Sequence, residues 1–386
     1  MSTGNLKEIT EILKQDDYPD TPRYSAESLR QERLLIYGAG SGFITLSMFV
    51  LDRFKITPEA VLDKKFSVPL CKNNTLFCSP DDFAASPETL THALVIITIG
   101  SPQVRAAIKR SLTAKGFSKI ISAIDIYEYH LPNPAKELAI QGFDFYKSNE
   151  KKIIQAFELL ADEKSREIFN SYLLSHLFRN PAAIPCEQPE NQYFPFDIWD
   201  ESTYRRTIIC GAYNGDTALT ISQKAPGIEA MVCLEPDPEN FENLTDNTKQ
   251  LKSIIPELLL LPLGVYKKNA QLHFAANKKS NSAISSDGNL LVQCAALDVC
   301  LPDFEPSFIS MDIEGAEFDA LQGMKEIIKR HHPELAICVY HSPDHIWSIP
   351  QFLHSLVPDY KFYLRNYTGF TSETVLYAKK IGSEEK

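Results

Sequence analysis

The sequence predicts an α/β protein built from two Rossmann-like domains. Short apolar segments rich in β-branched residues alternate with helix-like segments along most of the chain, and two of the apolar segments run into glycine-rich turns. Alternation of this kind is typical of a parallel sheet covered by helices. The length of 386 residues suits two domains of ordinary size, and we expect a domain at 1–147, a helical segment and linker at 148–200, and a second domain at 201–386.

The composition excludes several classes of protein. With 44% hydrophobic and 23% charged residues, the chain resembles soluble globular proteins and not disordered or coiled-coil ones. Its 39 basic and 50 acidic side chains give a net charge of −11, which disfavours binding to a nucleic-acid backbone. The eight cysteines occur singly, and the N-terminus lacks the basic-then-apolar layout of a signal peptide. We therefore expect a cytoplasmic protein with free thiols and no nucleic-acid partner.

The alternation in the N-terminal domain starts with the uncharged run Leu34–Leu51. Its 18 residues meet the crude length rule for a membrane helix, but three glycines within five positions argue for a buried strand at Leu34–Tyr37, a glycine turn and a helix that opens near Ser41. We therefore expect no membrane span. The alternation continues with a helix over 45–53, a strand over 60–63, a strand over 93–99, a helix over 103–115 and a strand over 119–124.

The first glycine turn departs from the dinucleotide-binding pattern. Phe43 occupies the third-glycine position of G-x-G-x-x-G, where a glycine allows close packing of helix on strand. Asp63 follows the next strand and could bind a ribose, but Lys64 and Lys65 beside it could equally neutralise it. Three roles stay open for this domain: binding a nucleotide or nucleotide sugar, presenting an acceptor, and serving as a structural partner.

The middle of the chain reads as a connector. Helical patterns over about 148–178 precede the proline-bearing segment 180–196, and alternation resumes at Arg206 and continues to Ala378. The alternation is interrupted over residues 269–300, where polar and β-prone residues predict a hairpin or a loop inserted into the sheet.

The second glycine turn carries the strongest local signal. An apolar strand at Thr207–Cys210 leads into Gly211 and Gly215 and then into a helix, so that the backbone can approach a ligand at the carboxyl end of the strand. The next strand, Ala230–Leu234, ends at Glu235. An acid in this place is well positioned to accept hydrogen bonds from ribose hydroxyls.

A third strand end is strongly acidic. The expected strand Ser307–Met311 leads into Asp312, Glu314 and Glu317 and then into a helix over Phe318–Lys329. Three carboxylates so close together repel one another unless a cationic ligand, a metal or a helix N-terminus compensates them. The helix macrodipole would favour Glu317 in the first turn, which accounts for part of the cluster, whereas Asp312 and Glu314 lie where open α/β sheets bind ligands.

Four ordered blocks of the C-terminal half resemble one protein family. They are GAYNGDT (211–217), LEPDPENFENL (234–244), LDVCL with SFISMDIEGAEFDALQGM (297–324), and HSPDHIWSIPQFL with YLRNYTGFTSETVLYA (341–378). On these blocks, residues about 204–380 are similar to the FkbM family of S-adenosylmethionine-dependent methyltransferases, and the N-terminal part resembles a Rossmann-type domain that precedes some sugar-modifying enzymes. The resemblance implies a class I methyltransferase fold with a mostly parallel seven-stranded sheet, acting on a hydroxyl of a sugar, glycoconjugate or natural product.

The resemblance also implies roles for single residues. The loop residues implied to hold the methionine part of the cofactor are Gly211, Ala212, Tyr213 and Gly215. Glu235 would bind the ribose, Asp312 would lie beside the methionyl end of S-adenosylmethionine, and Glu314 would lie near the acceptor. One departure stands out, because Ile209 occupies the position two residues before the first glycine, where such families commonly have an acid.

Methyl transfer to a hydroxyl needs alignment and a proton acceptor. His341, directly after the apolar strand Leu335–Tyr340, is the first candidate for the base, with Asp312 or Glu314 as the second. These three side chains are also suitable ligand types for a divalent cation, but spacing cannot show that they converge, and we assign no metal ligand. The acceptor is expected to be a small molecule or carbohydrate, and an oligomer stays open.

Two other functions compete with methyl transfer. A nucleotide-dependent oxidoreductase would use the first glycine turn, but Phe43 and the lack of an evident hydride-transfer constellation disfavour it. A non-catalytic nucleotide-binding or scaffold protein with a degraded cofactor site is supported mainly by Ile209. Calorimetry with the cofactor would separate these alternatives.

Overall fold

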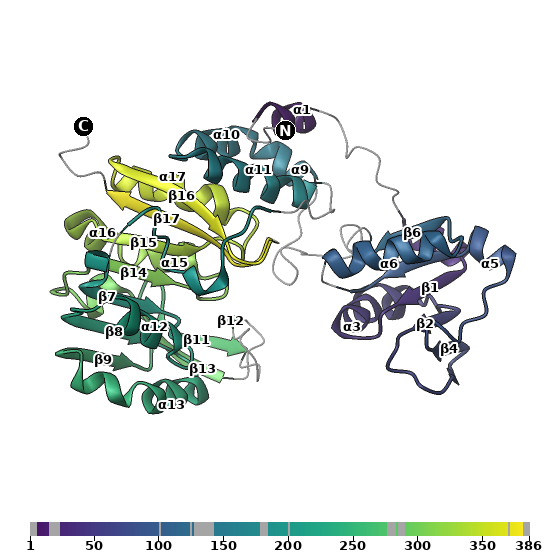
Figure 1. Ribbon diagram of the computed structural model, residues 1–386, viewed down its shortest axis with the longest axis horizontal. Coiled ribbons are helices and arrows are strands. Elements are labelled where there is room, and N and C mark those ends of the chain that lie inside the picture. The colour runs from purple at the N-terminus through teal and green to yellow at the C-terminus, as the bar shows by residue number, and fades with distance from the viewer. Residues whose placement is uncertain are drawn as a thin grey trace. The chain divides into compact units, whose positions relative to one another are not determined.

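The computed structural model describes residues 6–14, 24–99, 102–123, 126, 143–177, 184–199, 201–275, 283–284, 290–369 and 371–380. Contacts divide the chain into two compact units (Figure 1). The N-terminal unit comprises Thr10–Ser148 with Leu173–Ala182, and the C-terminal unit comprises Met1–Ile9, Asn149–Tyr172 and Ala183–Lys386. Both are α/β, which confirms the predicted class. Among the described residues, no helix combines the length and hydropathy needed to cross a membrane.

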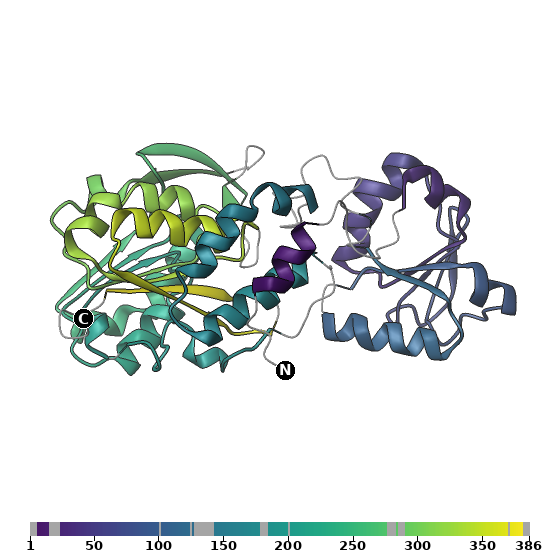
Figure 2. The same cartoon turned by 90° about the horizontal axis from the view of Figure 1, so that it is seen from above.

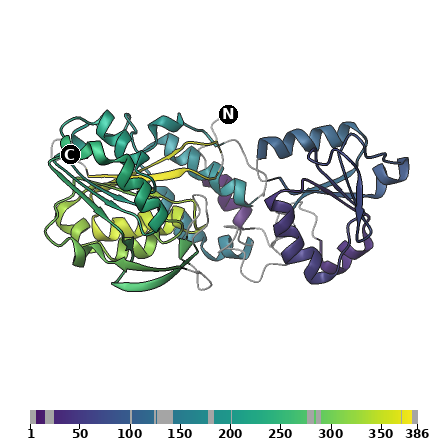
Figure 3. The ribbon, with the colours of Figure 1, turned by 90° about the horizontal axis from the view of Figure 1, so that it is seen from below.

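The N-terminal unit is a six-stranded sheet flanked by helices. In sheet order its strands are β3 (Leu70–Lys72), β4 (Thr75–Cys78), β2 (Ala60–Leu62), β1 (Leu34–Tyr37), β5 (Leu94–Ile97) and β6 (Lys119–Ser122). All neighbours pair in parallel except β3 and β4. The helices are α2 (Ala26–Gln31), α3 (Ser41–Leu46), which continues through the π-helical η1 (Ser47–Leu51) into α4 (Asp52–Phe54), α5 (Pro87–His92), α6 (Pro102–Ala114) and α9 (Phe143–Ser148). The purple α3 and the blue α6 lie on opposite faces of the sheet (Figure 3).

The first glycine turn is held by internal contacts. A Cβ added at Gly42 would lie 1.9 Å from the carbonyl oxygen of Thr98, so Gly42 gives the close helix-to-strand packing that Phe43 does not. The Asp63 carboxylate accepts hydrogen bonds from the backbone N–H of Ala39 at 2.7 Å and of Lys65 at 3.0 Å. Asp63 therefore fixes the shape of the turn, and a nucleotide ligand for this unit stays a prediction.

The C-terminal unit is built on a seven-stranded sheet. In sheet order its strands are β16 (Tyr360–Asn366), β17 (Thr374–Lys380), β15 (Glu334–Cys338), β14 (Phe308–Met311), β7 (Arg206–Cys210), β8 (Ala230–Leu234) and β9 (Glu257–Leu261). Only β17 runs antiparallel to its neighbours. β8 and β14 are buried along their whole lengths, as expected for parallel strands covered on both faces.

Helices cover both faces of this sheet. The green segment 216–253 lies on one face and the yellow-green segment 317–356 on the other (Figure 2). The first segment contains α12 (Asp216–Lys224), α13 (Pro238–Asn247) and the 3-10 turn η4 (Lys249–Ser253), and the second contains α15 (Glu317–Gln322), α16 (Lys325–His331) and α17 (His345–Leu356). The remaining helices are α1 (Leu6–Leu13), α10 (Glu150–Glu158), α11 (Glu163–Leu177), α14 (Leu297–Cys300) and the 3-10 turns η2 (Pro189–Asn191) and η3 (Glu201–Tyr204).

Two details of the predicted C-terminal fold are wrong. β11 (Ala270–Ala275) and β13 (Leu290–Ala295) do pair antiparallel, but with β10 (Gly264–Val265) and β12 (Ala283–Ile284) they form a separate four-stranded sheet and are not inserted into the main one. β13 buries Val292 and Cys294 in a small cluster of its own, whereas central strands of the main sheet such as β8 and β14 are buried on both faces. Residues 276–282 and 285–289 of this segment lie outside the described residues.

The helix expected over Phe318–Lys329 is interrupted at Gly323, which separates α15 from α16. A Cβ at Gly323 would lie 2.1 Å from the carbonyl oxygen of Tyr266. The chain therefore passes close to the backbone of the 264–267 segment at this point, which only glycine permits, and the helix starts again three residues after Gln322.

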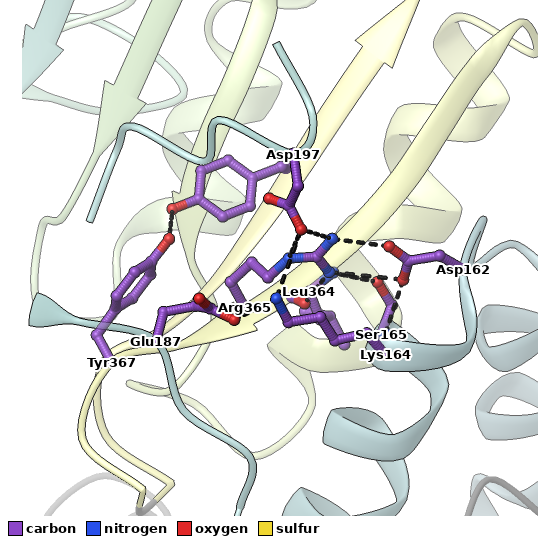
Figure 4. A network of polar contacts seen from close by, with 9 residues as sticks. Asp162, Lys164, Ser165, Glu187, Asp197, Leu364, Arg365 and Tyr367 are labelled. Atoms are coloured by element: carbon purple, nitrogen blue, oxygen red, sulfur yellow. Dashed lines mark hydrogen bonds and ion pairs between the residues drawn. The ribbon is translucent and has the colours of Figure 1, made fainter. Parts of the chain in front are cut away.

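Arg365 links the middle of the chain to the seven-stranded sheet through hydrogen bonds and ion pairs (Figure 4). Arg365 of β16 is 1% exposed, and its Nη2 donates to Asp162, just before α11, and to Asp197, each at 2.7 Å. The Nη1 of Arg365 donates to Ser165 at 3.1 Å. These contacts attach the start of α11 and the connector 184–199 to β16.

Candidate active site

A cavity with a volume of about 530 Å³ lies in the C-terminal unit. The carboxyl ends of four strands reach it: β7 through Gly211, β8 through Glu235, β14 through Asp312 and Glu314, and β15 through His341. In an open α/β sheet, ligands bind at this edge. The parallel topology therefore gathers acids and a histidine that are up to 106 residues apart in the sequence, from Glu235 to His341.

Six of the eight predicted site residues line the cavity: Gly211, Tyr213, Glu235, Asp312, Glu314 and His341. The other two, Ala212 and Gly215, do not line the cavity but help to hold the loop in place. The Ala212 N–H donates to the Leu234 carbonyl at 2.9 Å. Gly215 begins α12 at φ +90°, and a Cβ there would lie 2.8 Å from Cγ2 of Thr248.

The glycine loop is fixed by two neighbours. Gly211 has φ +80°, and a Cβ there would lie 1.9 Å from the Asp312 carbonyl oxygen, so the ends of β7 and β14 meet at van der Waals contact only because this residue is glycine. Glu235 accepts from the Tyr213 N–H and the Asp237 N–H, each at 2.9 Å, with one carboxylate oxygen for each. The loop is therefore preformed, with the Glu235 carboxylate on the cavity wall.

Three acids surround His341. Its Nδ1 lies 2.7 Å from Oε1 of Glu317, and its Nε2 lies 3.4 Å from Oδ1 of Asp312 and 3.4 Å from Oε2 of Glu314. On the other side of Glu317, Nδ1 of His345 lies 3.3 Å from Oε2. The imidazole thus joins a fully buried carboxylate to the two carboxylates that face the cavity.

Residues 210–367 match the family model of the Methyltransferase FkbM domain. The C-terminal unit thus contains an FkbM methyltransferase domain. This agrees with the resemblance drawn from the sequence blocks. The match ends before β17 and excludes the N-terminal unit.

One solved structure shares the fold over most of the chain. The methyltransferase FkbM from Methylobacillus flagellatus KT is 21% identical and has a TM-score of 0.72, with 90% of this chain and 90% of that chain covered. A putative rRNA-methylase from Clostridium thermocellum is 8% identical with a TM-score of 0.34, covering 51% of this chain and 98% of that one. The O-methyltransferase TomG from Streptomyces achromogenes is 11% identical with a TM-score of 0.33, covering 61% and 97%. No curated protein matches the chain.

The charges in the FkbM domain's cavity follow from this geometry. Burial by itself would lower the pKa of His341, but the charge and hydrogen bond of Glu317, together with Asp312 and Glu314, raise it to about 9. His341 is therefore an imidazolium at neutral pH and has no free lone pair to accept a proton. Its predicted role as the base does not fit this protonation state.

The two cavity acids are shifted toward neutral pH. Burial raises the pKa of Asp312 to about 6 and that of Glu314 to about 7, while the charge of His341 acts in the opposite direction on both. A general base works best when its pKa lies near the working pH. Glu314, one of the second candidates from the sequence, is therefore the best-matched proton acceptor in the cavity.

The cluster does not require a metal. Ligand atoms of Asp312, Glu317 and His341 lie within 4.8 Å of one another, a spacing that a cation could occupy. However, Nδ1 of His341 and Oε1 of Glu317 already pair at 2.7 Å, and two backbone N–H groups, those of Ile313 and Gly315, donate to the same oxygen. These contacts satisfy Oε1, while Oε2 has only the 3.3 Å contact with Nδ1 of His345, and we assign no metal ligand.

Sequence reasoning missed one wall of the cavity. Glu373 accepts from Nε2 of Gln192 at 2.8 Å and from the Tyr340 hydroxyl at 3.1 Å. Tyr193 also lines the cavity, and its hydroxyl lies 3.4 Å from Oδ2 of Asp312. Gln192 and Tyr193 come from the segment that the sequence suggested was only a connector. Only Glu373 and Tyr340 had a signal, since both lie in or next to blocks that resemble the family.

Backbone strain concentrates at the same cavity. Of eight non-glycine residues with positive φ among those described, four line it: Tyr193 at +67°, Tyr213 at +46°, Glu314 at +54° and Glu373 at +53°. Such conformations cost of order 1–3 kcal/mol each and persist where surrounding contacts enforce them. They aim side chains into the cavity, which is typical of a functional site.

The pKa of His341 predicts a stability that depends on pH. A group whose pKa rises from 6.5 unfolded to about 9 folded stabilises the fold fully below pH 6.5, and this contribution is lost as the pH rises through 9. We expect the free energy of unfolding of the C-terminal unit to fall over this interval by up to about 3 kcal/mol. Denaturant titrations at a series of pH values measure it.

The matched variants for this measurement are His341→Gln and His273→Gln. The first removes the shifted group and should flatten the curve between pH 6.5 and 9. The second replaces an exposed histidine of the same unit and, because it keeps His341, should retain the fall in stability between pH 6.5 and 9. Equal slopes for the wild type and His341→Gln would show that His341 is not held as an imidazolium.

Proposed function

We propose that the FkbM domain transfers the methyl group of S-adenosylmethionine to a hydroxyl of a carbohydrate or another small-molecule acceptor. One observation carries the proposal. A preformed glycine loop and Glu235, an acid placed to bind a ribose, share a cavity with Glu314, whose carboxylate is suited to accept a proton. The cavity thus combines a place for the cofactor with a base for the acceptor.

The cofactor would occupy the half of the cavity formed by β7 and β8. The loop at Gly211 and Tyr213 would hold the methionine part, and each oxygen of Glu235, with one backbone hydrogen bond already made, keeps a lone pair for a ribose hydroxyl. Asp312 and Glu314 would then face the sulfonium, whose positive charge their carboxylates favour. Ile209 lies in the apolar core of the unit. It therefore does not supply the acid that such families commonly have two residues before the first glycine.

Bound S-adenosylmethionine supplies the methyl electrophile, and the chain's own residues align the acceptor and receive its proton. Oε2 of Glu314 would take the hydroxyl proton as the oxygen attacks. The imidazolium of His341, 3.4 Å from that oxygen, holds the carboxylate in place. Asp312, with a pKa of about 6, would serve mainly as a fixed negative charge.

The lining favours an uncharged acceptor. It contains five carboxylates and, among the described residues, no lysine or arginine. The carboxylates are those of Asp216, Glu235, Asp312, Glu314 and Glu373. A phosphate or carboxylate group on the acceptor would find no positively charged side chain to pair with except the imidazolium of His341. We therefore expect neutral sugars, glycoconjugates or polyols to be methylated in preference to phosphorylated sugars.

The test of cofactor binding is Glu235→Gln. Because a glutamine can accept only one of the two backbone hydrogen bonds and carries no charge, we expect at least about a tenfold loss of affinity for S-adenosylhomocysteine. Calorimetry measures it, with Glu239→Gln, an exposed acid on the next turn, as the control. No heat from either S-adenosylmethionine or S-adenosylhomocysteine with folded wild-type protein would contradict the proposal and favour the scaffold alternative.

The test of the reaction is transfer of a labelled methyl group to panels of neutral and phosphorylated sugars, glycolipids and polyols. Label recovered on an oxygen of a neutral acceptor is the expected result. Label on nitrogen or carbon would contradict O-methylation, and a preference for phosphorylated acceptors would contradict the argument from the lining.

A further inference from the structure

Glu317 is a buried acid whose position is not explained by the helix it begins. Its side chain is 0% exposed, and Oε1 accepts from the N–H groups of Ile313 at 3.1 Å and Gly315 at 3.3 Å. It contacts His341, in the loop after β15, and His345, the first residue of α17. An acid that only interacted favourably with the helix macrodipole would need neither burial nor contacts with two histidines.

The orientation of His341 depends on this acid. The 2.7 Å contact between Glu317 and Nδ1 leaves Nε2 directed at Asp312 and Glu314, and the ring is held on its other side by Tyr340, with ring centroids 4.1 Å apart. Only 10% of the His341 side chain is exposed, so water does not compete strongly for either nitrogen. The imidazole is thus fixed in one pose between buried and cavity-facing carboxylates.

We propose that Glu317 is a positioning residue for methyl transfer: its buried carboxylate orients His341 and keeps both ring nitrogens protonated, so that Nε2–H donates to the acids of the cavity. The role in catalysis rests on the function proposed above. The charge state of His341 does not rest on it, and this allows the two to be tested separately.

The surrounding carboxylates favour the imidazolium. Asp312 and Glu314 face it from the loop after β14 and Glu317 from α15, while Glu373 acts on the same two cavity acids from across the cavity. His345 contacts the other oxygen of Glu317, with its Nδ1 3.3 Å from Oε2. Replacing Glu317 by a neutral residue would remove the shortest of these contacts.

Without Glu317, His341 would be neutral. One of its ring nitrogens would then carry a lone pair in place of an N–H donor. Glu314 would then lose the positive charge 3.4 Å away that keeps its carboxylate in place and lowers its pKa. The expected consequence is a weaker alignment of the proton acceptor, while the cofactor half of the cavity, which Glu317 does not line, is left intact.

The decisive experiment follows the histidine resonances by NMR across pH in full-length protein labelled at histidine. The chain has nine histidines, and the signal of His341 is identified by its loss in His341→Gln. In the wild type we expect His341 to remain an imidazolium until about pH 9. In Glu317→Gln we expect its titration midpoint to fall by at least about one pH unit, as removal of an adjacent charge does.

Controls separate charge from general damage. Glu242→Gln makes the same change at an exposed site on α13 and should leave the His341 midpoint unchanged. Glu317→Asp keeps the charge and should retain a midpoint above that of Glu317→Gln. Should Glu317→Gln fail to fold, the wild type and Glu317→Asp still decide, because a wild-type midpoint near 6.5 overturns the proposal by itself.

A second readout tests the positioning role on catalysis. With any acceptor that is methylated, Glu317→Gln should lower kcat by at least about tenfold and move the pH profile, while affinity for S-adenosylhomocysteine stays within about threefold. A loss of affinity with unchanged kcat would contradict positioning. Failure of the wild type to bind S-adenosylmethionine would instead remove the proposed function and leave the charge state of His341 standing.

Discussion

Gly211→Ala should destabilise the C-terminal unit by about 3 kcal/mol or more and lower its affinity for S-adenosylhomocysteine at least about a hundredfold. The new Cβ would lie 1.9 Å from the carbonyl oxygen of Asp312 and 3.0 Å from its carbon, and backbone atoms cannot rotate away. The end of β7 must therefore separate from β14, and both the glycine loop and the acids at the end of β14 must move.

Gly227→Ala is the matched control for this variant. Gly227 has φ +91°, close to the +80° of Gly211, but a Cβ there meets no atom within 4 Å. The control therefore carries only the conformational cost of a left-handed alanine, about 1 kcal/mol. The difference between the two variants isolates the steric contact between strands.

Tryptophan fluorescence measures both variants in urea. The two tryptophans, Trp199 and Trp347, are buried at 6% and 1% exposure and lie in the C-terminal unit, so their signal reports on that unit alone. Equal losses of stability for Gly211→Ala and Gly227→Ala would mean that β7 and β14 are not in the close contact described.

The sequence was informative about strand ends. Glu235, Asp312, Glu314 and His341 each follow a short apolar strand, and a parallel sheet places such ends along one edge. For this reason the residues that line the cavity from β7, β8, β14 and β15 could be predicted without side-chain geometry. The class of fold followed from the same alternation of strands and helices.

Other parts of the site had no local signal. Glu317 stands at the start of a short helix, where an acid is ordinary, and only the tertiary fold brings His341 and His345 against it. Gln192 approaches Glu373 across 181 residues of sequence. The positive φ of Tyr193 could not be predicted from the sequence either, because packing enforces it and residue type does not.

Arg365→Met should destabilise the same unit by about 3 kcal/mol, since removing one member of a buried ion network leaves its partners uncompensated. The guanidinium is 2% exposed, whereas Asp162 and Asp197 are 33% and 48% exposed, so water relieves part of the loss. Hydrogen bonds from Arg365 hold the pKa of both acids below its ordinary value despite burial, which raises it. The connector 184–199, which supplies one cavity wall, should loosen with them.

Arg205→Met removes an arginine from an exposed pair with Glu229, where the side chains are 65% and 45% exposed, and should cost much less stability than Arg365→Met. Replacing Asp162 and Asp197 by asparagine in the Arg365→Met background should recover part of the loss, because the repelling carboxylates are then gone. Trp199 fluorescence in urea follows all of these proteins. If Arg365→Met cost no more than Arg205→Met, the attachment of the connector to β16 would depend on apolar packing and not on this network.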